Sequence, residues 1–311
     1  MENNAAQPQG ARPGGSDRQS FNADLERALQ SPIPEVVQFA HDVKERLRGR
    51  RVSMLFTVVT VIAIFATTVA AVMTSMSPWV PFVVVFVLVA ISWALPPLHA
   101  KPAVPDFASI ENLLLEDCDP YRFARAYSDL MPLFRYAQDY VICKINVALG
   151  LFLQGAYGVM EEYLSSIDPY SIPEMALQGF YDLQAHYFLH TRDTGAIDIV
   201  ENNLRAFSRA HPYDFIATRC SETIDLIEAH RLAWSGDEEG AFARLDSRNR
   251  SVGELKKTPS PYQLVDYHYQ RAVVGEAVGD YSEMAQDCLY VIDHGGLLNY
   301  VQDASAMLAR H

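Results

Sequence analysis

Gly279-Asp280-Tyr281-Ser282-Glu283-Met284 is the clearest copy of a short turn that recurs along the second half of the chain. Related turns begin at residues 155, 191 and 236, so that successive turn starts lie 36, 45 and 43 residues apart. Each turn separates two stretches with apolar residues at helical spacing, and no stretch shows the sustained alternation of a half-buried strand. A repeated unit of two helices is typical of an α-solenoid, because one pair cannot bury its apolar face alone.

We therefore predict helices almost everywhere after residue 106. Asp117-Cys118-Asp119-Pro120 is expected to form a turn and cap, because Pro is favoured at the first position of a helix. The expected helices cover 107–116, 122–130, 136–154, 157–166, 174–190, 195–207, 215–234, 239–248, 262–278, 282–293 and 297–309.

The residues of these units resemble the tetratricopeptide repeat. That family has a small residue early in its first helix, a Gly-Asp-Tyr-like turn and an Ala at the start of its second helix. The corresponding residues here are Ala148, Ala229 and Ala272 in the first helices, Gly236-Asp237 and Gly279-Asp280-Tyr281 in the turns, and Ala196 and Ala241 in the second helices. Met160 and Met284 depart from the pattern, and the units are longer than the family's 34 residues. The resemblance implies a divergent helical-repeat domain whose concave face binds an extended peptide or a partner helix.

The part of the chain before the repeats predicts a different organisation. Residues 1–20 are expected to be a disordered tail, and 21–51 to form helices that end in a basic cluster. Residues 52–99 hold two charge-free apolar runs, 52–76 and 79–98, each long enough to cross a hydrocarbon core of about 30 Å. The fold class predicted for the whole chain is therefore all-α, with a transmembrane helical hairpin, a linker at 100–106 and a solenoid at 107–311.

The residues that flank the apolar runs predict an orientation in the membrane. Basic side chains precede the first run and accumulate on the cytoplasmic side of membranes, so both termini are expected in the cytoplasm. The expected location is the plasma membrane, with the lipid bilayer as one partner. The residues assigned to the membrane interface are Lys44, Arg46, Arg48, Arg50, Arg51, Trp79 and Trp93.

Ala63, Thr67 and Ala71 lie four residues apart on one face of the first apolar run. Small residues at this spacing allow two helices to approach closely. This face either packs against the second helix of the same hairpin or joins two copies of the chain into a homo-oligomer. The hairpin needs such a face in any case, so internal packing is the favoured interpretation.

Charge separates the two parts of the chain. Residues 1–101 carry a formal charge of +2 and residues 102–311 carry -15. The acidic part argues against binding to nucleic acid, which requires Lys and Arg to be concentrated on one surface. The short basic patch that includes Arg248 and Arg250 is interpreted as a solvated linker. The four cysteines show no metal-site or disulfide spacing, as expected in a reducing compartment.

His186 and His190 are the best candidates for a chemical site. Their spacing of four places both on one helix face, as metal ligands require, with Asp182 one turn earlier and Asp193 close behind. Tyr187 stands where a zinc protease would have Glu. A metal-dependent enzyme is kept as an alternative, but no catalytic motif, cofactor or third ligand is recognised, and the chain is not expected to be an enzyme.

The function expected from these patterns is that of a membrane-anchored scaffold. It would present its acidic helical-repeat surface to a protein or peptide partner. A structural subunit of a larger membrane complex is a second alternative. The side chains expected to line a peptide groove are Tyr187, Tyr267, Tyr269 and Arg271.

Overall fold

The computed structural model describes residues 15–29, 33–45, 62, 107–133, 138–211, 215–255 and 258–311. Within these ranges the chain is helical and contains no β-strand. The all-α part of the fold-class prediction is therefore confirmed for the described residues. The division of the whole chain into domains stays a prediction, although helix α1 already begins at Gly15, within the segment predicted as a tail.

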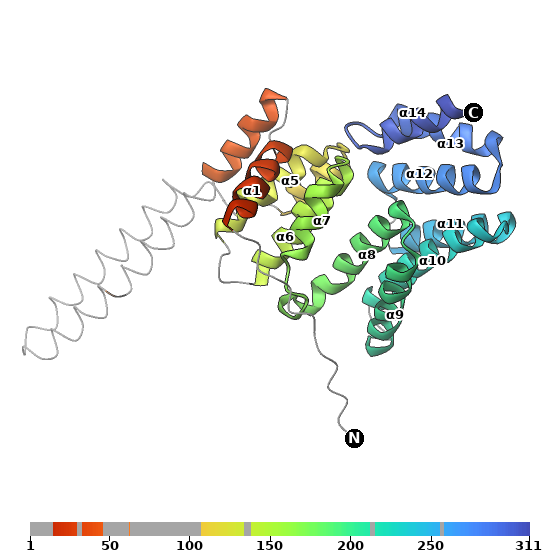
Figure 1. The fold of residues 1–311 in the computed structure, drawn as a ribbon, viewed down its shortest axis with the longest axis horizontal. Coiled ribbons are helices and arrows are strands. Elements are labelled where there is room, and N and C mark those ends of the chain that lie inside the picture. The colour runs from red at the N-terminus through yellow and green to blue at the C-terminus, as the bar shows by residue number, and fades with distance from the viewer. Residues whose placement is uncertain are drawn as a thin grey trace, which may run out of the picture.

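Between residues 138 and 294 the described helices form consecutive pairs, each packed against the next (Figure 1). The pairs are α6 (Gln138–Leu153) with α7 (Tyr157–Ser165), α8 (Glu174–Thr191) with α9 (Thr194–Ala210), α10 (Phe215–Ser235) with α11 (Glu238–Leu255), and α12 (Pro261–Val278) with α13 (Tyr281–His294). A short 3-10 helix, η2 (Pro169–Ser171), precedes α8, and α14 (Tyr300–Arg310) ends the chain. The predicted helix pairs are confirmed, and α11 continues beyond its predicted end at residue 248.

The turns inside the pairs have a common physical basis. Gly155, Gly236 and Gly279 have φ values of 78°, 84° and 86°, a left-handed conformation that glycine adopts without steric cost. In the remaining turn Arg192 takes this conformation, with φ of 56°. The side chain of Asp280 then accepts a hydrogen bond from the Glu283 backbone N–H at 3.1 Å, which caps α13. A glycine that is visible in the sequence thus marks the turn in three of the four pairs.

Helices from the first part of the chain pack beside the first pair. They are α1 (Gly15–Leu29), the helix 34–45, α4 (Phe107–Leu115), α5 (Pro120–Leu130) and the 3-10 helix η1 (Met131–Leu133). Helix α5 begins as predicted, because the Asp119 side chain accepts hydrogen bonds from the backbone N–H groups of Tyr121 and Arg122, with Pro120 at the first helical position.

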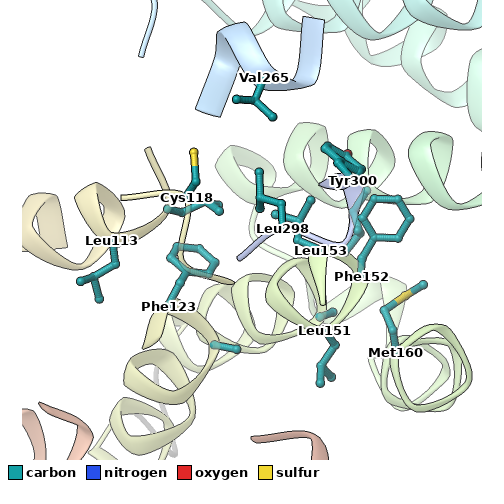
Figure 2. Packing of buried hydrophobic residues seen from close by; sticks show 14 of the residues in the cluster. Leu113, Cys118, Phe123, Leu151, Phe152, Leu153, Met160, Val265, Leu298 and Tyr300 are labelled. Carbon is teal, nitrogen blue, oxygen red and sulfur yellow. The ribbon is translucent and has the colours of Figure 1, made fainter. Parts of the chain in front are cut away.

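The last helices return to the first ones, so that the repeat body closes on itself. The connection before α14 reaches α5 and α6: the Leu297 N–H donates to the Cys118 carbonyl at 3.1 Å, and the Asn299 N–H to the Leu153 carbonyl at 2.8 Å. Figure 2 shows the shared core, in which Leu298 lies among side chains from α4, α5 and α6. The α-solenoid expected from the repeats is therefore closed: α6, α8, α10 and α12 contact one another in that order, and α12 also contacts α4.

The fold-class prediction needs correction in its membrane part. No helix among the described residues is long and apolar enough to cross a membrane. Helix α10, the longest of these helices, carries charged residues from Arg219 to Arg231, and each would cost about 2.5–3.5 kcal/mol at the centre of a bilayer. The predicted spans 52–76 and 79–98 lie outside the described residues, apart from the helical Ile62. The transmembrane hairpin and the integral-membrane location inferred from it are not supported, and the fold class is corrected to all-α.

Most of the residues assigned to the membrane interface and to the small-residue face lie outside the described residues. Lys44 lies exposed near the end of the helix 34–45. The other residues of the predicted interface and of the small-residue face lie outside the described residues: Arg46, Arg48, Arg50, Arg51, Trp79, Trp93, Ala63, Thr67 and Ala71.

A substitution at Gly150 can test the close packing of α6 on α5. A Cβ at Gly150 would lie 2.6 Å from the Ala124 Cβ and 3.0 Å from the Pro120 carbonyl oxygen. Gly150→Ala should lower the free energy of unfolding by about 1–3 kcal/mol, because a methyl group is forced into a filled space. Gly179→Ala is the matched control, since Gly179 is an exposed position of α8 and nothing lies within 4 Å of a Cβ built there. It should raise the free energy of unfolding by about 0.5–1 kcal/mol. Urea unfolding followed by circular dichroism measures both, and equal effects would contradict the packing.

Candidate functional site

The closed arrangement surrounds a cavity of about 430 Å³, which we call the charged cavity. Helices α8, α10 and α12 contribute most of its wall, and α4, α6 and α11 contribute the rest. The volume lies within the range of small-ligand sites, although most such sites are more apolar. The charged residues in its wall are Glu111, Asp182, Glu222, Asp266, Arg219 and Arg248, together with His186.

A second cavity of about 280 Å³ lies further along the same helices. The charged cavity is lined by Asp182 of α8 and Asp266 of α12, whereas the second cavity is lined by His190 and Gln270 from later turns of the same two helices. His186 lines both cavities. The side chains around His186 therefore separate the two cavities.

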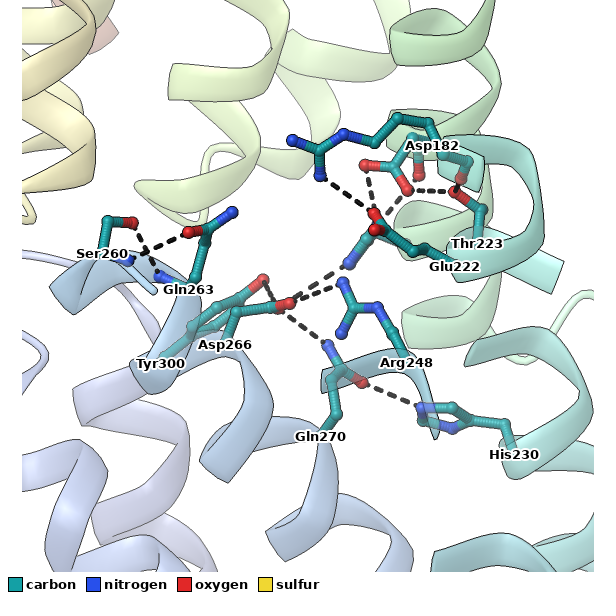
Figure 3. Close-up of polar contacts among 12 residues, drawn as sticks. Asp182, Glu222, Thr223, His230, Arg248, Ser260, Gln263, Asp266, Gln270 and Tyr300 are labelled. Carbon is teal, nitrogen blue, oxygen red and sulfur yellow. Dashed lines mark hydrogen bonds and ion pairs between the residues drawn. The ribbon is translucent and has the colours of Figure 1, made fainter. Parts of the chain in front are cut away.

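Asp266 is the centre of the polar network between the cavities (Figure 3). One carboxylate oxygen accepts from the Arg248 guanidinium at 2.8 Å. The other accepts from the Gln270 side-chain amide at 3.3 Å and from the Tyr300 hydroxyl at 3.4 Å. Gln270 continues the network, with its Oε1 2.9 Å from the His230 Nε2. The network therefore connects α11, α12, α14 and α10 inside the protein.

The start of α12 positions Asp266. Pro261 occupies the first turn of this helix, and Ser260 caps it in a capping box (Figure 3). The Gln263 N–H donates to the Ser260 hydroxyl at 3.3 Å, and the Ser260 N–H donates to the Gln263 side-chain oxygen at 2.9 Å. Such a start fixes the register of the first turn. Asp266 then lies one turn further along and faces the interior, 5% exposed.

The charges in this network influence one another strongly. Burial alone would raise the pKa of Asp266, but the Arg248 guanidinium and the His186 ring hold it well below its usual range. Burial alone would lower the pKa of His186, but the carboxylates of Asp182 and Asp266 raise it to about 8. Burial lowers the pKa of His230 to about 4, against the opposing hydrogen bond to Gln270. At neutral pH, His186 is therefore charged and His230 is neutral.

Three buried polar atoms have no hydrogen-bond partner among the residues that the structure describes: His186 Nε2, Glu222 Oε1 and Arg248 Nε. The nearest ion-pair contact of His186 Nε2 is Asp266 Oδ1 at 3.7 Å, which is too long for a hydrogen bond. Leaving a buried polar group unpaired costs about 1–3 kcal/mol, and more when the group is charged. All three residues line the charged cavity.

The residues predicted to line a peptide groove are only partly brought together. Tyr267 lines the charged cavity, and its hydroxyl donates to the Asp246 carboxylate at 2.6 Å. Arg271 donates to the same carboxylate at 3.2 Å and also pairs with carboxylates of α13. Tyr269 is buried on the second cavity, with its ring stacked 3.9 Å from Tyr300. Tyr187 lies apart and donates to Glu161 of α7 at 2.9 Å. Their role in partner binding stays a prediction.

The predicted histidine pair lies on one face of α8, with Phe152 beside both rings. His190 packs on the Tyr157 ring, 4.2 Å between centroids. His186 Nδ1 donates to the Asp182 carbonyl at 2.9 Å. Within the described ranges, no group of three or more His, Cys, Asp or Glu residues is placed to hold a metal ion. The pair thus contributes to packing and to the polar network.

The buried partners of His186 were missed by reasoning from the sequence. Arg248 was interpreted as part of a solvated linker, whereas it lies within α11, pairs with Asp266 and has only 15% of its side chain exposed. Glu222 and His230 were not singled out. Arg219 and Glu222 at helical spacing within α10 were a usable signal of an internal ion pair, but nothing local indicates that Asp266 would meet Arg248.

Comparison with known proteins adds no relative. No protein-family model matches the chain, and neither a curated protein nor a solved structure matches it. The architecture itself, helices packed in neighbouring pairs, is compatible with a helical-repeat fold.

The raised pKa of His186 predicts how stability depends on pH. The groups that face its ring are Asp182, Asp266, Arg248 and His230. A histidine with a folded pKa of about 8 and an unfolded pKa of 6.5 contributes stability that is complete below pH 6.5 and is lost as the pH rises through 8. The loss should reach about 2 kcal/mol.

Urea unfolding between pH 6 and pH 9 measures this loss. His186→Gln should remove the extra dependence on pH, whatever its effect on overall stability. His294→Gln is the matched control, because His294 is exposed at the end of α13, and it should keep the dependence. An unchanged pH dependence in His186→Gln would contradict the assignment of charge to His186.

Proposed function

We propose that this protein is a binding protein of the divergent tetratricopeptide-like class, and that the charged cavity receives a segment of a protein or peptide partner. The observation that carries the proposal is the convergence of α8, α10 and α12. Each first helix contributes polar side chains to one cavity, where three buried polar atoms have no partner among the described residues. In helical-repeat proteins, extended inner surfaces of this kind are used for binding.

The packing of the pairs supports the repeat assignment. Ala148, Ala229 and Ala272 are fully buried, as expected for small residues where helices approach closely. Gly236 and Gly279, the glycines of the two turns that resemble the family, have a left-handed backbone that favours glycine. These features support the proposed class.

The composition of the cavity supports a polar segment as the bound species. The wall carries four carboxylates, two guanidinium groups and the His186 ring, with only a few apolar side chains. Hydrogen bonds to charged groups contribute about 1.5–3 kcal/mol each when well formed. Polar groups of a partner could thus gain specific contacts here that an apolar molecule could not.

Peptide selection with a blocked cavity tests the proposal. A random 12-residue peptide library would be selected on the full chain, and the affinity of the enriched peptides measured by fluorescence anisotropy. Gln178→Trp places a large side chain in the wall of the charged cavity and should weaken binding at least tenfold.

The control for this experiment is Gln302→Trp, the same substitution at an exposed position on α14 that lines neither cavity. It should leave the affinity unchanged. Circular dichroism checks that both variants fold. The proposal is wrong if no peptide is enriched, or if enriched peptides bind Gln178→Trp as tightly as the unchanged protein.

A further inference from the structure

We propose that the charged cavity binds an organic cation, an ammonium or guanidinium group, between the carboxylates of Asp182 and Glu222. This inference rests on the proposed function, because it names the chemistry recognised at the same site. The cation can be the side chain of a lysine or arginine in a partner, or a free small amine.

Glu222 provides the first free acceptor. Its side chain is 5% exposed, and one oxygen, Oε2, accepts from the Arg219 guanidinium at 2.9 Å. The other oxygen, Oε1, is buried without a hydrogen-bond partner in the described part of the chain. Glu222 lines the charged cavity, so a donor that entered the cavity could pair with this oxygen.

Asp182 provides a second acceptor beside the first. Its Oδ1 accepts from the Thr223 hydroxyl at 2.6 Å. Its Oδ2 is 3.8 Å from His186 Nδ1, beyond hydrogen-bond distance, and 37% of the side chain is exposed. Within the described ranges, no Lys or Arg forms an ion pair with Asp182. Figure 3 shows the Asp182 and Glu222 side chains next to each other, with Thr223 beside them.

The charge balance of the wall favours a cation over an anion. Arg219 is already paired with Glu222, and Arg248 with Asp266, so each guanidinium charge already has a carboxylate partner. Burial, and in addition the nearby Asp182 charge, raise the pKa of Glu222, while Arg219 lowers it. A positive charge placed between the two carboxylates would relieve their repulsion.

The aromatic part of the wall indicates an organic cation rather than a metal ion. Phe215 lies at the cavity with 55% of its surface exposed, and the Arg219 guanidinium already rests 5.1 Å from its ring centroid. Tyr262 and Tyr267 line the same wall. Aromatic faces attract ammonium and guanidinium groups, whereas the described residues offer no set of three metal ligands.

The unpaired donors in the cavity are consistent with a cation that carries a carbonyl group nearby. His186 Nε2 and Arg248 Nε each need an acceptor. The backbone carbonyl of a lysine-containing peptide provides one. A free amine carries no carbonyl group, so the two possible sources of the cation differ in whether they can also pair with these donors.

The test uses the full chain and two probes, each with a neutral partner of the same shape. The first probe is 1,5-diaminopentane, compared with 1,5-pentanediol. The second is acetyl-Gly-Lys-Gly-amide, compared with the same peptide in which norleucine replaces lysine. Isothermal titration calorimetry should detect binding of at least one cationic probe and no binding of either neutral compound.

Substitutions then locate the binding. Glu222→Gln and Asp182→Asn each remove one negative charge, and each should lower the affinity for the cationic probe at least tenfold. Asp198→Asn is the matched control, because Asp198 is an exposed carboxylate on α9, outside both cavities, and it should leave the affinity unchanged. Two site variants are used because Glu222 is buried; circular dichroism shows which of them fold.

The outcomes separate the alternatives. Binding of the peptide alone identifies a side chain of a partner as the source, and binding of diaminopentane alone identifies a small amine; both support the inference. It is overturned if no cationic probe binds, or if binding survives in both Glu222→Gln and Asp182→Asn. In that case selected peptides that still lose affinity in Gln178→Trp would leave the proposed function standing with a different ligand chemistry.

Discussion

The return of the chain from Leu297 and Asn299 to the carbonyls of Cys118 and Leu153 is the contact on which the rest of the structure depends. Helix pairs that stack only on their neighbours would leave an open surface along α6, α8, α10 and α12. Because the last helices pack on the first, Leu298 and Tyr300 become part of the core that also holds Leu151 and Phe152. The inner surface thereby forms two cavities that stay partly open to solvent.

Enclosure also explains the polar interior. A carboxylate such as Asp266 loses its hydration inside the closed body, and removing one partner of a buried ion pair costs about 3–5 kcal/mol. Arg248, Gln270 and Tyr300 together provide that compensation from three different helices. Inside the closed body the carboxylates of Asp182 and Asp266 raise the pKa of His186 against the effect of burial. Polar atoms of residues that line the charged cavity are also left there without partners among the described residues. The closed packing of the helices thus accounts both for the buried ion pairs and for the buried polar atoms without partners.

Local sequence signals predict much of this architecture, and distant contacts account for what they miss. Gly236, Gly279 and Asp280 mark their turns because left-handed backbone and capping are properties of single residues. The pairing of Arg248 with Asp266 is not predictable in this way, since it depends on how α11 and α12 are packed. The predicted membrane hairpin followed from the length of two apolar runs, and no described helix supports it.

Disulfide trapping tests the closure of the body most directly. A Cβ at Gly296 would lie 3.0 Å from the Cys118 Cβ, so that a small outward shift brings the two atoms to the 3.5–4.5 Å typical of disulfides. Mild oxidation of Gly296→Cys should therefore form an intramolecular bond to Cys118, seen as the loss of two hydrogens in the intact mass and located by peptide mapping. Gly236→Cys, at a glycine with a similar positive φ and no neighbour within 4 Å, should not cross-link. A folded Gly296→Cys protein that cross-links no faster than Gly236→Cys would contradict the closed structure.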